Sequence, residues 1–293
     1  MCRKLVAVVI VVLIASFAVQ VSLVSAQTNI TSCQTISTAG KYTIPPQTNM
    51  ASSGGDCLVI TASNVTIQAG PGGSIQGTGE SGAGIHVMSG AANFTWIPDA
   101  GTIQNYSAGI ELDSTGARIE NNFDDPECLE NVSAGVLIKS GTGNIVDAVA
   151  THAQYNGIWI QGGSKNIVTG YESSIQEGFS TTDCSHETVA SDSDGIRIDN
   201  STGNLIYQVD VTQGTSVGVH IVEGSKYNYV VNNLIQGSGV GIGIKDDGSG
   251  SNFIYENTLK NNQLDQQDNN PNCDHDFWFN DIFSTSSPSS CAF

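Results

Sequence analysis

The stretch SDSDGIRID, residues 191–199, contains a four-residue pattern that recurs along the chain and decides its fold. The pattern is a glycine, an apolar residue, any residue and a second apolar residue. It begins at Gly84, Gly109, Gly135, Gly157, Gly195, Gly218 and Gly241. The spacings between these glycines are 25, 26, 22, 38, 23 and 23 residues. A period this regular predicts a repeat architecture.

Each repeat contains two or three short runs of strand-forming residues, separated by Gly and Asn. Both of these residues tolerate the left-handed backbone of a tight corner. A second pattern, Asn followed by alternating apolar residues, has the same period and begins at Asn64, Asn93, Asn144, Asn166, Asn204, Asn228 and Asn252. No sustained helical stripe follows residue 26, and a β-sandwich of short strands would not keep this register. We therefore predict an all-β protein, a parallel β-helix of about eight to ten coils.

Alternation along each strand assigns the side chains to the inside or the outside of the solenoid. The predicted inward column is Ile85, Ile110, Val136, Ile158, Ile196, Val219 and Ile242. The predicted outward column is His86, Glu111, Leu137, Trp159, Arg197, His220 and Gly243. A second outward column, two residues later, is Met88, Asp113, Lys139, Gln161, Asp199, Val222 and Lys245. Solvated faces of this fold are usually Thr, Ser and Asn, so these outward columns indicate a functional face.

Residues 1–26 read as a secretory signal peptide: Arg3 and Lys4 precede an apolar stretch, and small residues end at Ala26. An uncleaved membrane anchor is the alternative, because the apolar stretch approaches a spanning length. The remainder contains 8 basic and 28 acidic side chains, a net charge of −20 (8 − 28). That charge argues against nucleic acid and anionic membranes as partners and permits divalent cations. We expect a secreted, extracellular monomer with no membrane contact after cleavage.

Six cysteines remain after the signal, and an even number in an exported chain favours disulfides. The expected pairs are Cys33–Cys57, Cys273–Cys291 and Cys128–Cys184. The first two would cap the ends of the solenoid, and the third would join two long insertions. We divide the chain into an N-terminal cap with the first strands (27–63), the β-helix (64–265) and a C-terminal cap (266–293). The tail aromatics are expected to cover the core, with a sugar-binding platform as the alternative: Phe277, Trp278, Phe279 and Phe283. Glycosylation sequons occur at Asn29, Asn64, Asn93, Asn105, Asn131 and Asn200.

These repeats resemble the right-handed parallel β-helix proteins of the pectin-lyase-like superfamily over roughly residues 55 to 265. The segments around Cys33, Cys57 and Asn64 are similar to the start of many secreted members. The resemblance implies a right-handed solenoid and an extracellular polysaccharide as partner. Asp192-Ser-Asp194-Gly195 also resembles the Asn-Thr-Asp-Gly segment of polygalacturonases, whose Asp contributes to hydrolysis. The following coils lack the acidic pair and the histidine of those enzymes, so no single enzyme family matches and no reaction carries over.

Two insertions, residues 121–133 and 177–193, are expected to wall a groove above the outward columns. The candidate substrate-binding residues are Trp159, Arg197, Glu111 and Lys139, and the candidate catalytic residues are Asp194, His220, Asp192 and Asp199. Paired carboxyl groups roughly 5–10 Å apart would serve glycoside hydrolysis. In a lyase or epimerase, His220 or Lys139 would be the base, and Arg197 or a calcium ion would neutralise a uronate carboxylate. Alternatively, Asp194 and Asp199 merely form solvated ion pairs with Arg197, each worth about 0–1 kcal/mol.

The sequence thus predicts a secreted cell-wall or matrix protein that binds, cleaves or modifies an acidic polysaccharide. Hydrolase, lyase and epimerase chemistry stay open, and whether the protein is an enzyme at all stays open with them. The alternative is a non-catalytic structural or adhesion β-helix, a stiff extracellular rod. The five histidines have no close metal-ligand spacing, so no transition-metal site is predicted. Calcium is the one cofactor that the acidic composition allows.

Overall fold

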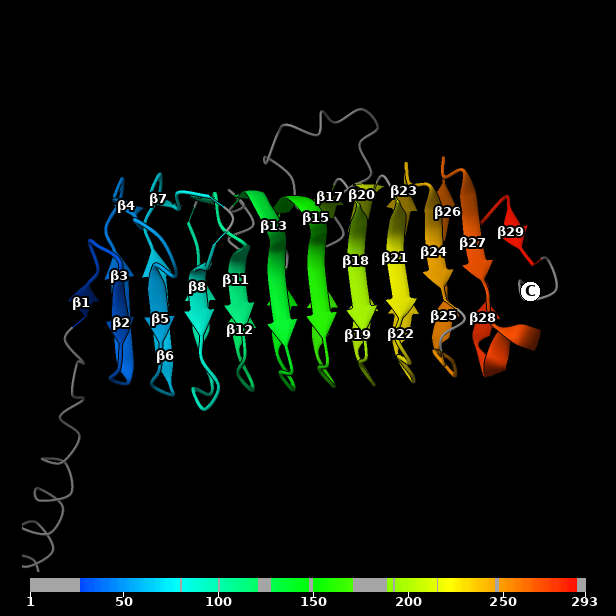
Figure 1. Cartoon of the computed structure of the whole chain (residues 1–293), viewed down its shortest axis with the longest axis horizontal. Helices are drawn as coiled ribbons and strands as arrows, with labels where there is room; N and C mark the ends of the chain where they lie inside the picture. The colour runs from blue at the N-terminus through cyan, green and yellow to red at the C-terminus, as the bar shows by residue number, and fades with distance from the viewer. Residues whose placement is uncertain are drawn as a thin grey trace, which may run out of the picture.

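The computed structural model describes residues 27–288 apart from 80, 100, 121–127, 148–149, 171–188, 192, 215 and 246–247. The described chain is a parallel β-solenoid of about nine turns, in which successive rungs lie side by side along one axis (Figure 1). All the strand pairs between rungs are parallel. The predicted fold class and coil number are confirmed. In the described residues, no helix is long and apolar enough to span a membrane.

One sheet contains β1 (Thr28–Asn29), β3 (Gly40–Ile44), β6 (Val65–Ala69), β9 (Thr95–Ile97), β12 (Arg118–Ile119), β14 (Ile145–Asp147), β16 (Ile167–Thr169), β19 (Leu205–Tyr207), β22 (Tyr229–Val231), β25 (Phe253–Tyr255) and β28 (Phe277–Phe279). We call it the first sheet. It runs from Thr28 to Phe279.

The remaining strands form two further parallel ladders, and two long strands take part in both of them. The second ladder contains β4 (Asn49–Ala51), β7 (Ser74–Gln76), β10 (Thr102–Gln104), β17 (Val189–Ser191), β20 (Asp210–Gly214), β23 (Leu234–Gln236) and β26 (Thr258–Lys260). The third contains β2 (Gln34–Ile36), β5 (Leu58–Ile60), β8 (Ala83–Val87), β11 (Ala108–Leu112), β18 (Asp194–Asp199), β21 (Val217–Val222), β24 (Val240–Ile244), β27 (Leu264–Asp268) and β29 (Ser286–Ser287). Strands β13 (Cys128–Lys139) and β15 (Ala150–Gln161) belong to both. One 3₁₀ helix, η1 (Pro271–His275), precedes β28.

The glycine of the repeated pattern lies where the backbone of the next rung leaves no room for a Cβ atom. A Cβ atom on Gly195 would lie 2.6 Å from the carbonyl oxygen of Gly218, and one on Gly218 would lie equally close to the carbonyl oxygen of Gly241. Real Cβ atoms do not approach a neighbouring backbone so closely, because the contact is far inside van der Waals distance. The sequence period therefore reflects a steric requirement that returns once per rung.

The inward column is confirmed over its whole length. All seven predicted residues, from Ile85 to Ile242, are at most 1% exposed. They stack in register, so that Ile196 lies between Ile158 and Val219. Stacked β-branched side chains fill a narrow interior without leaving polar groups to satisfy.

The asparagine pattern proves to occupy two different positions. Asn144, Asn166, Asn204, Asn228 and Asn252 are fully buried. The register of the first sheet places Phe94 at the position of Asn144, which leaves Asn93 one residue earlier. Asn64 and Asn93 have φ angles of 57° and 55° and form an exposed hydrogen bond with each other. They are corner residues with a left-handed backbone. The prediction that all seven asparagines share one position of the repeat is therefore wrong, because Asn64 and Asn93 lie one residue before the position of the buried asparagines.

The buried asparagines form a hydrogen-bonded ladder. The backbone N–H and Nδ2 of Asn204 donate to Oδ1 of Asn228, at 3.0 and 2.9 Å. Asn228 donates in the same way to Asn252. The last acceptor is Asp276, which receives both bonds from Asn252. A shorter ladder of Asn233 and Asn257 ends on Asp281. A terminal rung needs only an acceptor, which explains why a carboxylate closes each ladder.

These terminal acids predict a pH-dependent C-terminal end. Burial raises the pKa of Asp276 from 3.8 to about 7 and that of Asp281 from 3.8 to about 6, although the hydrogen bonds from Asn252 and Asn257 oppose the shift. The folded state therefore keeps two protons that the unfolded chain releases near pH 4. Stability from this source is complete below pH 4 and is lost as the pH rises to 7. We expect the melting temperature of Asp276→Asn/Asp281→Asn to fall less between pH 4.5 and 7.5 than that of the parent. Parallel melting curves would contradict the assignment.

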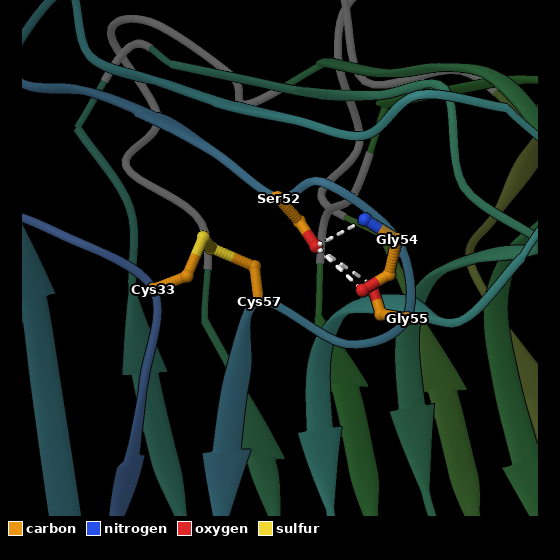
Figure 2. Close-up of a disulfide and its surroundings, with 5 residues drawn as sticks. All are labelled: Cys33, Ser52, Gly54, Gly55 and Cys57. Atoms are coloured by element: carbon orange, nitrogen blue, oxygen red, sulfur yellow. Dashed lines mark hydrogen bonds between the residues drawn. A yellow bond between two sulfur atoms is a disulfide. The ribbon is translucent and has the colours of Figure 1, made fainter.

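The N-terminal disulfide is confirmed. Cys33 and Cys57 are bonded with a Cα–Cα distance of 4.4 Å, beside a loop in which the Ser52 hydroxyl bonds to Gly54 and Gly55 (Figure 2). Cys273 is also disulfide-bonded, but Cys291 lies outside the described residues, so a cap closed by Cys273–Cys291 stays a prediction. Cys184 lies outside them too, and Cys128–Cys184 is likewise untested.

The predicted role of the tail aromatics is partly wrong. Trp278 is buried, at 4% exposed, and Phe283 packs against the core. Phe277 and Phe279, however, are 56% and 68% exposed. The cause is alternation in β28, which can turn only every second side chain inward. Phe277 instead extends a stack of rings with Tyr229 and Phe253 on the outside of the first sheet.

Candidate functional site

The outward column is built as the sequence predicts. Strands β8, β11, β13, β15, β18, β21 and β24 place His86, Glu111, Leu137, Trp159, Arg197, His220 and Gly243 in adjacent register positions. In the second column, Lys139, Gln161, Asp199 and Val222 are also aligned. Val222 is fully buried and Asp199 is 4% exposed, so this column turns into the corner and is only partly outward.

A cavity of about 600 Å³ lies over the middle of this face. Its lining includes Leu137, Tyr155, Trp159, Asp194, Arg197 and Asp199. Ser193 and Glu223 also line it. We call this cavity the groove. It brings together four of the eight predicted site residues, and its lining includes Leu137, Trp159 and Arg197, the residues predicted to form its floor.

Asp194 is the central polar group at one side of the groove. It is 4% exposed, and its Oδ2 atom lies 2.8 Å from Nδ1 of His220 and 3.3 Å from Nη1 of Arg197. His220 lies one rung beyond Arg197 and is not part of the groove lining. Nδ1 of His220 faces a carboxylate, which favours the neutral tautomer with its proton on Nδ1 and its lone pair on Nε2. The arrangement is a carboxylate–imidazole pair, the form in which histidine serves as a base.

Arg197 joins the two carboxylates. Its Nε atom donates to Oδ2 of Asp199 at 3.3 Å, while Nη1 donates to Asp194. Within the described part of the chain, Nη2 of Arg197 makes no hydrogen bond. Oδ1 of Asp199 is buried and likewise has no hydrogen-bond partner there. An unpartnered buried carboxylate oxygen is costly, so this atom marks a place where water or a ligand completes the structure.

The aromatic side chains give the groove an apolar wall. Tyr155 is 58% exposed, and Trp159 lies between Leu137 and Arg197 in the column. The indole N–H of Trp159 is buried and makes no hydrogen bond to the described residues. Apolar rings beside carboxylates and a guanidinium form a surface suited to a ligand with both apolar faces and hydroxyl groups.

Two other predicted site residues, Glu111 and Lys139, lie elsewhere on the outward face. Asp192 is outside the described residues, as are most residues of both insertions, so the predicted groove walls are untested. Glu111 and Lys139 form an ion pair at 3.3 Å, two rungs and one rung before Trp159, and neither lines the groove. The predicted outward column already placed Leu137 between Glu111 and Trp159, but the sequence could not show that the groove ends before it reaches Glu111 and Lys139.

Glu111 belongs to a second polar cluster that the sequence analysis missed. His86 Nδ1 lies 2.7 Å from Oδ2 of Asp56, and its Nε2 lies 3.4 Å from Asp113 and 3.8 Å from Glu111. Burial lowers the pKa of His86, but the hydrogen bond and charge of Asp56, the charge of Glu111 and the bond to Asp113 raise it more, so the net shift is upward. Asp56 precedes His86 by a full rung in a corner, and no repeat pattern marks it.

Residues 60–287 match the model of a family described as "Periplasmic copper-binding protein (NosD)". No curated protein matches the sequence.

Solved structures with low identity are similar to this chain. The enzymatically active domain of tailspike protein 2 from bacteriophage CBA120 is 13% identical, with a TM-score of 0.44, 89% of this chain and 42% of that chain covered. The A-module of the Azotobacter vinelandii mannuronan C-5 epimerase AlgE4 is 12% identical, with a TM-score of 0.39, 85% and 87% covered. The periplasmic alginate epimerase AlgG is 13% identical, with a TM-score of 0.31, 85% and 74% covered. The chain spans about two fifths of the tailspike domain.

Proposed function

The chain belongs to the NosD family, and on that premise we propose that it acts outside the cytoplasm and binds an acidic polysaccharide in its groove. The observation that carries the proposal is the meeting of Trp159, Arg197, Asp194 and Asp199 around one cavity. Sugar rings present an apolar face and a rim of hydroxyl groups. Trp159 and Tyr155 suit the face, and the carboxylates suit the hydroxyls.

Charge decides where an acidic sugar would bind. Arg197 is the one basic side chain among the described groove residues, against the acids Asp194, Asp199 and Glu223. A uronate carboxylate is therefore accommodated only at Arg197, whose Nη2 group has no protein partner among the described residues. Forked, charge-assisted bonding suits this pair. A calcium ion shared by a uronate and Asp199 would reduce the remaining repulsion, so binding is expected to rise with calcium.

If the protein is an enzyme, the contacts favour His220 over the carboxylates as the reacting group. Glycoside hydrolysis needs two carboxyl groups that face the glycosidic bond, whereas Asp194 and Asp199 are both held in ion pairs with Arg197. His220 Nε2 could take the proton from C5 of a uronate. In a lyase the electron pair then forms the C4–C5 double bond and expels the C4 oxygen; in an epimerase a proton returns to the other face. The substrate must reach one rung past the groove for this step.

Binding to defined polymers tests the groove. Alginate and polygalacturonate, each with and without calcium, are the probes, and dextran is the neutral comparison. We expect Trp159→Ala and Arg197→Lys each to weaken polyuronate binding about fivefold or more, since a lost stacking contact or fork costs roughly 1 kcal/mol or more. Arg197→Lys keeps the charge beside Asp194 and Asp199, so its melting temperature should stay close to the parent's.

Tyr255→Ala is the matched control, because it removes a partly exposed aromatic ring from the first sheet, away from the groove. It should leave binding unchanged. If Trp159→Ala and Arg197→Lys bind as the parent does, the groove has no ligand role, and the protein is a stiff structural β-helix instead. His220→Ala should abolish unsaturated or epimerised products without loss of binding, provided the parent turns the polymer over.

The family description names copper, so we ask whether any described residues could bind it. Cu(II) accepts imidazole nitrogen and carboxylate oxygen, whereas Cu(I) prefers thiolate and thioether sulfur. His86, Glu111 and Asp113 offer one nitrogen and two oxygens whose ligand atoms lie within 4.8 Å of one another. This set fits a divalent ion such as Cu(II) and does not fit Cu(I). When bound, such an ion would supply a fixed positive charge on the outward face.

A further inference from the structure

We propose that the second polar cluster, formed by Asp56, His86, Glu111 and Asp113, is a site for a divalent transition-metal ion, separate from the groove. His86 Nε2 and one oxygen each from Glu111 and Asp113 would be the ligands. Asp56 would hold the imidazole in place without touching the metal. The site lies on β8 and β11, on the same outward face as Trp159 but with the Leu137 rung between them.

The orientation of the imidazole is set before any metal binds. Asp56 Oδ2 lies 2.7 Å from His86 Nδ1, and its other oxygen accepts the backbone N–H of Ala83 at 2.8 Å. The carboxylate is thus anchored to the strand that carries His86. Nδ1 donates its proton toward Asp56, which leaves Nε2 as the ring nitrogen that faces Glu111 and Asp113. A carboxylate that orients a ligating histidine in this way is a recurrent feature of zinc and copper sites.

The distances suit a metal ion of small radius. Two ligands at about 2.1 Å from a tetrahedral ion lie roughly 3.4 Å apart. His86 Nε2 lies 3.4 Å from Oδ2 of Asp113 and 3.8 Å from Oε1 of Glu111. Only small rotations of the two carboxylates are needed to bring all three atoms to bonding distance. The three ligand residues come from adjacent rungs, so the rigid spacing of the solenoid determines the separation of His86 from the acids.

Charge and burial favour a divalent ion over a harder or larger one. With a neutral imidazole, the three carboxylates (−3) and Lys139 (+1), which lies 3.3 Å from Glu111, sum to −2. One divalent cation balances that charge. The side chains of His86 and Glu111 are each 15% exposed, and that of Asp113 is 23% exposed, which leaves one open side for water. A nitrogen ligand and so few oxygens suit zinc or Cu(II) better than calcium, which takes six to eight oxygens.

The alternative to a bound metal is a proton on Nε2 of His86, because an imidazolium would also form an ion pair with Asp113. A metal site and a simple ion pair differ in whether the metal-free protein binds added ions. We would titrate chelator-treated protein with Zn(II) by calorimetry and with Cu(II) by electron paramagnetic resonance. The expected result is one equivalent of ion bound per chain, with nitrogen hyperfine coupling from a single imidazole in the copper spectrum.

Variants then assign the site. His86→Ala should lose the stoichiometric ion and the nitrogen coupling, and Glu111→Gln/Asp113→Asn should lose it with the imidazole intact. Asp56→Asn should weaken binding roughly 10–100-fold, as expected for an orienting group. His220→Ala is the matched control: it removes the other outward histidine that pairs with an aspartate, and it should keep both the ion and the coupling.

The proposal is overturned if no equivalent of either ion binds, or if His86→Ala and Glu111→Gln/Asp113→Asn bind as the parent does. If His86→Ala fails to fold, the variant Glu111→Gln/Asp113→Asn still tests the site, because it removes two proposed ligands and retains the imidazole. Polyuronate binding by Trp159→Ala and Arg197→Lys is independent of these readouts, so the metal site and the groove can fail separately.

Discussion

Ile196→Asp should prevent folding. Ile196 is fully buried between Ile158 and Val219 in the inward column. The substitution removes roughly 2–3 kcal/mol of apolar burial and places a carboxylate where no partner is available, at a further cost of several kcal/mol. The sum, about 5 kcal/mol or more, is comparable to the whole stability of a typical domain. We expect no cooperative melting transition and loss of the β signal in circular dichroism.

Leu205→Asp is the matched control for this variant. It makes the same kind of change, aliphatic to acidic, on β19, where Leu205 points outward beside the buried Ile206. It should express and melt near the parent. If Ile196→Asp melts normally as well, the register that places the outward column on the surface is wrong, and the proposed groove loses its basis.

Asn228→Ala is expected to have the next largest effect. Its Oδ1 atom accepts two hydrogen bonds from Asn204, and its Nδ2 donates to the Ser201 carbonyl and to Oδ1 of Asn252, at 3.2 and 3.1 Å. Removing the side chain leaves the donors of Asn204 buried without an acceptor. Each of these two donors costs about 1–3 kcal/mol, so we expect a loss of roughly 2–6 kcal/mol in the free energy of unfolding, measured by denaturant titration.

Two comparisons separate the ladder from a general effect of losing an amide. Asn49→Ala removes an exposed side chain that accepts one bond, from Ser74, and should cost well under 1 kcal/mol, as surface substitutions usually do. Asn228→Asp keeps the acceptor but places a carboxylate oxygen against Oδ1 of Asn252. It should be nearly as destabilising as Asn228→Ala at neutral pH. Equal stability of Asn228→Ala and Asn49→Ala would show that the buried ladder contributes little.

The asparagine ladder also matters for the site, because it holds successive rungs in register. The groove and the neighbouring His220 depend on Trp159, Arg197 and His220 occupying adjacent register positions. The metal-site proposal depends equally on His86 and Glu111 doing so. A slip of one residue in any rung would turn its outward residue into the core. The buried amides and the inward isoleucines therefore determine the geometry of side chains that they never touch.

The inward or outward direction of the strand side chains could be predicted from the repeat. A strand has a side-chain period of two and a solenoid has a near-constant rung length, so Gly195-Ile-Arg-Ile determined that Ile196 faces inward and Arg197 outward. The same reasoning misassigned Asn64 and Asn93, because asparagine occurs in this chain both at corners with positive φ angles and in the buried ladder. Only the φ angles and the register of the first sheet distinguish the two positions.

The tertiary structure alone decided which outward residues meet. The sequence by itself determined the all-β solenoid, the inward stack and the column that carries Trp159, Arg197 and His220, because these depend on local alternation. It did not determine that Asp194 is buried against His220 and Arg197, or that Asp56 reaches His86 from a corner one rung away. Those contacts join side chains on different rungs, and they depend on the lengths of the corners between strands. Corner length varies from rung to rung and carries no periodic signal in the sequence.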